Sequence, residues 1–315
     1  MSSGMPCPRR VGVIGAGRVG AVVAAALAAA GHEVVAASGE SDASRDRAAA
    51  LLPGVPLDKP SAVARAADLL LLTVPDDMLG NVVDVLTASG AIRPGQVVVH
   101  TSGRHGLAAL EPARLAGARV VALHPAMTFT GTATDLPRVA ACAYGATAAP
   151  ADRPVVEGLV ADLGGRVVWV PEERRALYHA ALAHGANHLV TLVAEAREIL
   201  AASADGVTDP ADVLRPLLEA ALDNALRAGD AALTGPVVRG DVGTVATHLD
   251  EIGREAPQAL ASYRTLARAT VGRAATDGRL LPIRAARLLQ EIDAPEHDAA
   301  PSGRDTTHPG PEAVR

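Results

Sequence analysis

Short apolar runs alternate with helical stretches through the first half of the chain. The runs are continuous rather than alternating, which is typical of strands that are buried on both faces of a parallel sheet. Two later runs, residues 140–144 and 167–170, flank a predicted helix near residues 154–163 and are expected to extend the same sheet. The pattern therefore predicts an α/β fold with a doubly wound, mostly parallel sheet. The runs that carry this prediction are residues 11–14, 34–37, 69–74, 97–100 and 120–123.

The second half of the chain has a purely helical pattern. After Pro171 the strand signals stop, and residues 172–202 predict one long helix with leucines in helical register. We therefore expect a sheet domain over residues 9–171, an all-helical domain over residues 172–293, and frayed tails at residues 1–8 and 294–315. Gly and Pro breakers separate the other expected helices, at residues 210–228, 241–252, 256–276 and 281–292.

A glycine-rich turn joins the first predicted strand to an alanine-rich helix. This is the context that the dinucleotide-binding fingerprint of a Rossmann fold requires. Gly15 allows the turn, Gly17 lets a pyrophosphate approach the backbone, and Gly20 lets the helix pack on the strand. The amides at the helix N-terminus would donate to the phosphates. The expected cofactor loop is Gly15, Ala16, Gly17, Arg18, Val19 and Gly20.

The choice between NAD and NADP depends on the residue that ends the second strand, where NAD enzymes usually place an acid. Here that residue is Ser38, and Ser41 and Arg45 follow it closely. These three side chains could donate to a 2′-phosphate, although Glu40 is an unfavourable neighbour for one. We therefore expect NADP, with NAD as the alternative. The backbone that ends the third run is expected to border the cofactor, at Thr73, Val74 and Pro75.

The composition limits the classes of partner that this chain is expected to bind. The chain has one Phe and one Trp, a formal charge of -6, and no cluster of aromatic side chains on which nucleic-acid bases could stack. Neither nucleic acid nor an anionic membrane is therefore an expected partner. Cys7 and Cys142 lack a disulfide or metal-ligand spacing, and no export signal or membrane span is visible. A small organic acid bound by a cytoplasmic protein is the expectation that remains.

Two histidines follow successive predicted strands at the edge of the sheet where open α/β folds bind ligands. His100 opens the segment His100-Thr101-Ser102-Gly103, and His124 precedes Pro125. Each could be a hydrogen-bonded structural imidazole or a catalytic group. Ser102 is the better candidate for binding a substrate carboxylate or carbonyl, because Gly103 leaves room for close approach.

The long predicted helix carries further polar candidates. His184 and Asn187 are three residues apart, and His184 and His188 are four apart, so they can share a face. The histidines lack the glutamate and third ligand of a zinc site, and no metal is expected. Asn187 could cap a core network or orient a substrate oxygen. Further on, Arg239 could bind a carboxylate or form a surface ion pair, and Asp241 is expected to cap a helix.

Together these motifs resemble proteins that join an N-terminal Rossmann-like domain to a C-terminal DUF2520 domain. The resemblance implies kinship with the 6-phosphogluconate and 3-hydroxyisobutyrate dehydrogenases, an NADP-type cofactor, and a homodimer formed through the helical domain. It also implies ketopantoate reduction as the leading specific activity. The motifs that carry it are the glycine loop, Thr73-Val74-Pro75-Asp76, His100-Thr101-Ser102-Gly103, Leu123-His124-Pro125, Tyr178-His179, Asn187-His188, Leu233-Thr234-Gly235-Pro236 and Arg239-Gly240-Asp241.

We therefore expect an NADP(H)-dependent oxidoreductase of a 2-oxo or 2-hydroxy acid. Two alternatives stay open, an oxidation like that of the prephenate dehydrogenases and a non-catalytic NADP(H) sensor. Related hydroxyacid dehydrogenases use a lysine on the interdomain helix, but Lys59 is the only lysine of this chain. Because an unperturbed imidazole has a pKa near 6.5, the expected proton donors are His124, then His100, then His184. Ser102, Asn187 and Arg239 are expected to hold the substrate.

Overall fold

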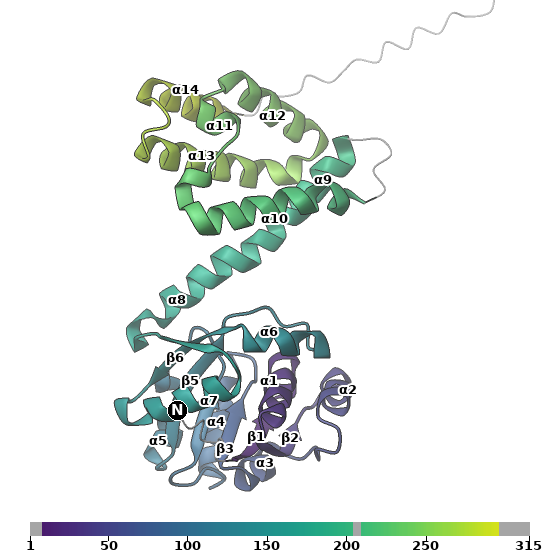
Figure 1. Ribbon diagram of the computed structural model, residues 1–315, viewed down its shortest axis with the longest axis vertical. Helices are drawn as coiled ribbons and strands as arrows, with labels where there is room; N and C mark the ends of the chain where they lie inside the picture. Colours follow the sequence, from purple (N-terminus) through teal and green to yellow (C-terminus); the bar gives the residue numbers. More distant parts are fainter. Residues whose placement is uncertain (1–7, 204–208, 296–315) are drawn as a thin grey trace, which may run out of the picture. The chain divides into compact units, whose positions relative to one another are not determined.

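The computed structural model describes residues 8–203 and 209–295. The chain divides into two compact units, Met1–Ala186 and Asn187–Arg315, and Figure 1 shows a sheet unit and a helical unit. The tails expected at residues 1–8 and 294–315 lie almost wholly outside the described residues. Within the described part of the chain, no helix combines the length and the apolar character that crossing a membrane requires.

The first unit contains a seven-stranded sheet in the order β2-β1-β3-β4-β5-β6-β7. Every neighbouring pair is parallel except β5 and β6, which confirms the expected mostly parallel α/β sheet. The strand expected at residues 140–144 begins later, because Leu136–Ala140 forms a helix. The strands are β1 Arg10–Ile14, β2 Glu33–Ser38, β3 Leu69–Leu72, β4 Val97–His100, β5 Arg119–Pro125, β6 Ala143–Ala148 and β7 Arg166–Trp169.

Helices cover both faces of this sheet. Consecutive side chains of a strand point to opposite faces, so Leu69 and Leu71 join one buried cluster while Leu70 and Leu72 join the other. This explains why the strands are apolar at every position. One cluster includes side chains of α1 Arg18–Ala29, α2 Asp42–Leu51, α6 Leu136–Ala140 and α7 Arg153–Asp162, and the other includes side chains of α3 Pro60–Ala66, α4 Leu79–Ala88 and α5 Glu111–Leu115.

The last strand carries the only tryptophan. Trp169 is partly buried against the cluster that includes α1, and the guanidinium of Arg153 lies 4.8 Å from the centre of its ring. Such cation–π contacts stabilise a partly exposed aromatic side chain modestly.

The long helix expected over residues 172–202 exists, with an irregularity near its middle. It begins with a 3₁₀ turn at Glu172–Arg174 and continues as α8 Arg175–Leu182. Ala183–Asn187 then forms a π-helical turn, and α9 His188–Ser203 follows. A π turn holds one extra residue per turn, so the regular spacing on which we expected His184, Asn187 and His188 to share a face does not apply within this segment.

The second unit is helical, as expected. Its buried core draws mainly on α12 Val242–Glu255, α13 Leu260–Thr276 and α14 Pro282–Ile292. The short helix α11 Pro236–Arg239 lies between the helices expected at residues 210–228 and 241–252. Asp241 caps α12 by accepting a hydrogen bond from the Thr244 amide at 3.1 Å, which confirms the predicted cap. By contrast, α9 and α10 Pro210–Ala228 contain no fully buried residue.

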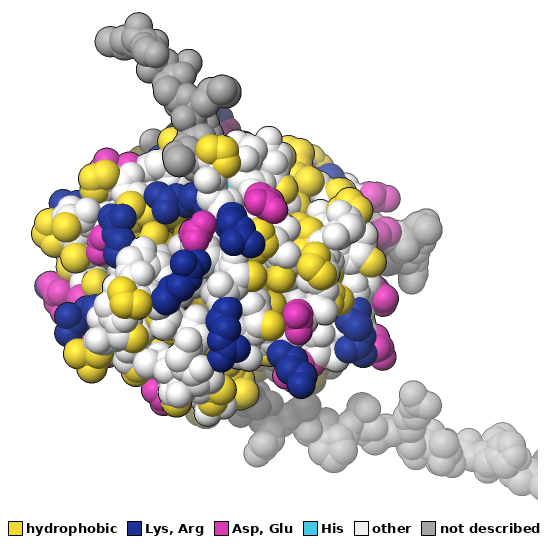
Figure 2. Space-filling view, turned by 90° about the horizontal axis from the view of Figure 1, so that it is seen from below, with side chains coloured by type: hydrophobic (Ala, Val, Ile, Leu, Met, Phe, Trp, Pro, Cys, Tyr) yellow, Lys and Arg dark blue, Asp and Glu magenta, His cyan; other side chains and the backbone are white. Residues whose placement is uncertain are grey.

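Surface charges of both signs are mixed. On the face shown in Figure 2, Lys and Arg side chains are interspersed with acidic and hydrophobic ones. Several arginines form exposed ion pairs with nearby acids, such as Arg114 with Glu111 and Arg93 with Asp68. Exposed pairs of this kind contribute little to stability.

Candidate functional site

The glycine loop lies between β1 and α1 and rests on neighbouring strands. Gly15 has φ +97°, a conformation that glycine adopts without strain. The amides of Gly15 and Ala16 both donate to the carbonyl of Ser38, at 3.1 and 2.7 Å. Ser38 therefore holds the loop through its backbone, and its own side chain is buried.

Gly20 marks the closest approach of α1 to the sheet. A Cβ at this position would lie 2.3 Å from the Gly15 carbonyl oxygen and 2.3 Å from Oγ1 of Thr73. The Thr73 hydroxyl in turn donates to the carbonyls of Gly15 at 2.6 Å and Ile14 at 3.2 Å. Thr73, the residue after β3, thus fixes the loop, and Val74 is partly buried against the cluster that includes α3 and α4. The helix and the loop can approach this closely only with glycine at position 20.

The same loop leaves space where a dinucleotide phosphate is expected. Gly17 is the N-cap of α1, and a Cβ there would meet no protein atom closer than 3.9 Å. The first helical bond is donated by Ala21 to the Gly17 carbonyl, so the amides of Arg18, Val19 and Gly20 precede the bonded turns of the helix. Open amides beside an unfilled glycine position fit a pyrophosphate group.

The residues expected to bind a 2′-phosphate make local hydrogen bonds in this structure. The hydroxyl of Ser41 caps α2 by accepting from the Ser44 amide at 3.2 Å. The guanidinium of Arg45 donates to the Glu40 carbonyl at 2.6 Å and to the Asp42 carboxylate at 2.5 Å. Ser38 is buried, whereas Ser41 and Arg45 are exposed in this conformation. Their predicted role toward a 2′-phosphate stays a prediction.

Two other arginines meet close to the glycine loop. A Cβ on Gly131 would lie 2.9 Å from Cγ of Arg18 and 2.9 Å from Nε of Arg47. Gly131 belongs to the loop after β5, which the buried Asp135 orders by accepting from the Thr130 and Gly131 amides, each at 2.8 Å. Arg47 is half-buried on α2 and Arg18 is exposed on α1. Two positive side chains therefore flank one glycine beside the N-terminus of α1.

His100 shapes the loop that follows β4. Its Nδ1 accepts from the Ser102 amide at 3.2 Å, and its Nε2 lies 3.0 Å from the Gly106 carbonyl, to which it donates. The ring is fully buried, so neither nitrogen faces a ligand in this conformation. The Ser102 hydroxyl accepts from the His105 amide at 3.2 Å and is largely buried as well.

His124 pairs with a tyrosine that sequence reasoning named but did not assign a role. Nδ1 of His124 lies 3.0 Å from the hydroxyl of Tyr178 on α8. Two glycines make room for the pair. A Cβ on Gly103 would lie 3.2 Å from the His124 ring and 2.5 Å from the ring of His179, and a Cβ on Gly145 would lie 2.4 Å from the Tyr178 ring. The register of β5 and β6 sets Gly145 directly opposite His124.

Burial changes how these groups titrate. Desolvation, reinforced by the positive charge of Arg175, lowers the pKa of both His100 and His124 to about 4. Burial raises the pKa of the Tyr178 hydroxyl, while Arg175 opposes that shift. The expectation of an imidazole that titrates near pH 6.5 is therefore wrong for these two histidines, and both are neutral at pH 7.

Comparisons with protein families match the two halves separately. Residues 2–125 match the Rossmann-like domain family, and residues 142–270 match DUF2520, a domain of unknown function. The Rossmann-like match is thus followed along the chain by the DUF2520 match. His124 lies in the first match and Tyr178 in the second, so their hydrogen bond joins residues of both. No curated protein sequence matches the chain significantly.

Solved structures share the fold. A Bacteroides fragilis protein assigned as an NADP oxidoreductase has 20% identity and a TM-score of 0.71, over 84% of this chain and 98% of that one. A Thermotoga maritima protein has 20% identity and a TM-score of 0.61, over 85% and 99%. An imine reductase from Pseudomonas sp. has 21% identity and a TM-score of 0.62, over 91% and 100%.

The remaining residues that the sequence predicted to act on a substrate lie near or inside the second unit. His184 and Asn187 are exposed in the π turn that ends the first unit and begins the second. Arg239 is exposed at the end of α11, and its carbonyl accepts from the Arg284 guanidinium at 3.0 Å. Their predicted roles toward a substrate stay predictions.

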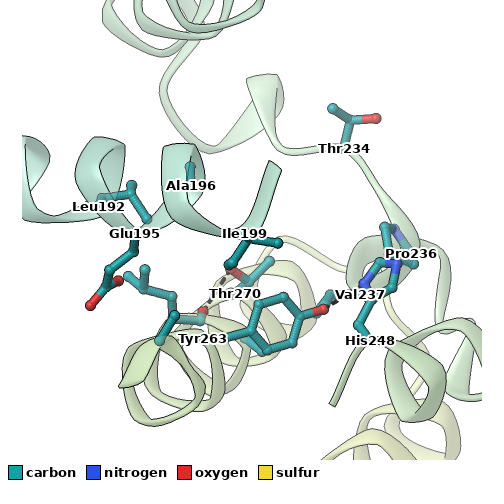
Figure 3. A pocket seen from close by; sticks show the side chains of 13 residues that line it. Leu192, Glu195, Ala196, Ile199, Thr234, Pro236, Val237, His248, Tyr263 and Thr270 are labelled. Atoms are coloured by element: carbon teal, nitrogen blue, oxygen red, sulfur yellow. Dashed lines mark hydrogen bonds between the residues drawn. The ribbon is translucent and has the colours of Figure 1, made fainter. Parts of the chain in front are cut away.

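The helical unit contains a cavity of about 390 Å³. Figure 3 shows its mainly apolar lining, which α9, α11, α12 and α13 contribute, with the hydrogen bond between Nδ1 of His248 and the hydroxyl of Tyr263 at 2.8 Å. Glu195 also lines the cavity and accepts from the Ser262 hydroxyl at 2.6 Å. None of the residues singled out in the sequence as a candidate for chemistry lines this cavity.

Proposed function

We propose that this chain is an NAD(P)(H)-dependent oxidoreductase that acts on a small organic acid. The observation that carries the proposal is the pairing of an open glycine loop with the His124–Tyr178 pair in one unit. The loop ends β1, and His124 lies near the carboxyl end of the parallel strand β5. In folds of this kind ligands bind outside the carboxyl ends of the strands.

NADP(H) is the proposed cofactor, with NAD as the alternative. Gly17 and the amides that begin α1 would accept the pyrophosphate. We assign discrimination of a further phosphate to Arg18 and Arg47 rather than to Ser38, Ser41 and Arg45. Arg18 and Arg47 flank Gly131 beside the loop, whereas Arg45 already serves Glu40 and Asp42. A guanidinium suits a phosphate because it donates in a planar fork.

The bound nicotinamide would supply or accept a hydride, and the chain would move the proton. For carbonyl reduction, Nε2 of the neutral His124 donates a proton to the substrate oxygen while the Tyr178 hydroxyl passes its proton to Nδ1. The phenolate that remains is reprotonated from water. The direction reverses for oxidation of a hydroxy acid. A hydroxyl within hydrogen-bond distance of the imidazole is the geometry that such a transfer needs.

The proposed substrate is a 2-oxo acid, with ketopantoate first in a panel of such acids. The test is oxidation of NADPH by purified protein against that panel, together with prephenate and NADP in the opposite direction. Turnover of one oxo acid with kcat/KM above about 10⁴ M⁻¹s⁻¹ would retire the sensor alternative. Binding of NADPH without turnover of any panel member would favour the sensor and refute the enzyme.

A second candidate reaction is reduction of a carbon–nitrogen double bond. It is favoured by the shared fold with proteins named imine reductase and pyrroline carboxylate reductase. A cyclic imino acid therefore belongs in the same panel. Preference for it over every oxo acid would replace the first proposal.

We also propose a homodimer that buries α9 and α10. These two helices have no fully buried residue within one chain. A helix in water depends on packing of its apolar face for most of its stability, and α10 leaves Leu217 at 65% and Leu226 at 79% exposed. A second copy of the same helices would cover these side chains symmetrically.

A further inference from the structure

A buried arginine acts electrostatically on both members of the His124–Tyr178 pair. Arg175, the first residue of α8, is only 1% exposed and is among the largest fully buried side chains of the described chain. One terminal nitrogen donates to the Thr147 hydroxyl at 3.0 Å and to the Gly145 carbonyl at 3.4 Å, and the other donates to the Ser102 carbonyl at 2.6 Å. Its Nε has no hydrogen-bond partner among the described residues.

No adjacent acid among the described residues neutralises the charge of this arginine. The carboxylates of Glu172 and Asp76 act on it through space, but Glu172 is bonded to the amides of Leu107 and Ala108, and Asp76 pairs with Arg104. Burying a cation without a counter-ion costs free energy. An arginine kept in such a position therefore points to a role other than stability. A perturbed charged group beside a candidate site is the pattern that functional residues show.

The hydrogen bonds of Arg175 connect it to the backbone segments that contact His124 and Tyr178. Ser102 directly precedes Gly103, whose missing Cβ makes room for the rings of His124 and His179. Gly145 itself lies under the ring of Tyr178. One guanidinium therefore joins the loop after β4, the strand β6 and the start of α8, which carries Tyr178.

We propose that Arg175 is a positioning residue that holds the His124–Tyr178 pair in place and whose uncompensated charge makes this site select an anionic substrate. The inference rests on the proposed function and specifies its substrate class as a carboxylate. The guanidinium acts through its hydrogen bonds to Ser102, Gly145 and Thr147 and, being buried, does not touch the substrate. A positive charge in a poorly solvated site attracts an anion more strongly than the same charge in water.

The test compares Arg175→Met, Arg175→Lys and the control Arg174→Met, in which the neighbouring exposed arginine is removed. The first measurement is a titration of the His124 ring by NMR, which needs no substrate. The groups that act on this ring are Arg175, His179, Asp76, His100 and its partner Tyr178. Arg175→Met should raise the pKa of His124 and alter its contact with Tyr178, whereas Arg174→Met should leave both unchanged.

The second measurement is kcat/KM for an oxo acid against its neutral methyl ester. Wild type should favour the acid, and Arg175→Met should lose about tenfold or more of that preference. Arg175→Lys should keep the preference but lower kcat, because an ammonium cannot hold the three acceptors in the same geometry. If Arg175→Met does not fold, Arg175→Lys still tests the positioning role.

An unchanged His124 titration in Arg175→Met, or wild-type kcat in Arg175→Lys, would overturn the positioning role. An unchanged acid-to-ester preference in Arg175→Met would overturn the charge selection. If wild type turns over neither compound, the proposed function fails. The role of Arg175 would then be tested by the His124 titration and by comparing the binding of pyruvate with that of methyl pyruvate. Equal binding of the two compounds would contradict the charge selection.

Discussion

Two glycines of one motif have different physical reasons for lacking a side chain. Gly17 faces open space and has φ -76°, a value open to any residue. Gly20 faces two oxygen atoms at 2.3 Å from a would-be Cβ. The fingerprint in the sequence treats both as the same letter, whereas the structure separates a binding role from a packing role.

Gly17→Ala and Gly20→Ala should therefore fail in opposite ways. Gly17→Ala should lose about 0.5–1 kcal/mol of stability, since alanine is a poorer N-cap than glycine, and should lose NADPH affinity about tenfold or more. Gly20→Ala should lose about 1–3 kcal/mol of stability by overpacking. Denaturant unfolding and NADPH titration check both, and a Gly17→Ala protein that binds NADPH normally would contradict the assigned role.

The two buried histidines make stability fall in mild acid. In the unfolded chain an imidazole binds a proton below about pH 6.5, but in the folded protein the pKa of His100 and of His124 is about 4. The unfolded state alone gains protons as the pH falls from 6.5 to 4, so the folded state loses stability across that window. The loss should be on the order of 2 kcal/mol per histidine at pH 5.

His124→Gln should reduce this dependence, because it removes one of the two titrating groups. The measurement is the free energy of unfolding at pH 7 and pH 5 for both proteins. A wild type that is equally stable at the two pH values would show that these rings accept protons in the folded state.

At the level of single residues, the sequence predicted which positions belong to the candidate site more readily than what each side chain does there. The glycine loop could be predicted because its spacing follows from the chemistry of one turn. The His124–Tyr178 bond joins residues 54 positions apart, and only the strand order brings them together. Arg175 and Arg174 are adjacent identical letters, and nothing in the sequence says which is buried.

The reversed strand β6 decides what lies beside His124. Because β6 runs antiparallel to β5, it begins at the edge of the sheet where β5 ends, and Gly145 falls opposite His124. A continuous apolar run indicates a buried strand but carries no direction, so the sequence predicted the element and not its orientation. The consequence is a side-chain-free position on which Tyr178 rests.

Gly145→Ala should displace Tyr178, since the new methyl group would lie 2.4 Å from its ring. We expect kcat to fall about 10²-fold, as a displacement near 1 Å in a reacting group can cause. The matched control is Gly158→Ala on α7, where a Cβ meets no atom within 4 Å. It should leave kcat unchanged and raise stability by up to about 1 kcal/mol. Equal kcat in both variants would remove Tyr178 from the mechanism.

For the whole molecule, the division into a sheet unit and a helical unit follows directly from the hydrophobic pattern. The hydrophobic pattern does not show which element packs against the apolar face of each helix. Apolar side chains recur at helical spacing in both α10 and α12, yet α12 has buried residues and α10 has none. Burial depends on neighbours that a single helix does not encode.

The proposed homodimer predicts that charge on α10 will dissociate it. Wild type should sediment at twice the chain mass of 31.9 kDa, and the double variant Leu217→Glu with Leu226→Glu should sediment as a monomer. Arg287→Glu, which places the same side chain at an exposed position of α14, should remain dimeric. A wild type that is monomeric at micromolar concentration would exclude this interface.

The single indole at the edge of the sheet also makes the molecule a natural spectroscopic probe. Trp169 belongs to the same unit as the glycine loop, and the sequence has no other tryptophan. Its emission therefore reports unfolding of the sheet unit alone, while far-ultraviolet circular dichroism reports both units. Energy transfer from this one donor to reduced nicotinamide would turn cofactor binding into a fluorescence signal that requires no label.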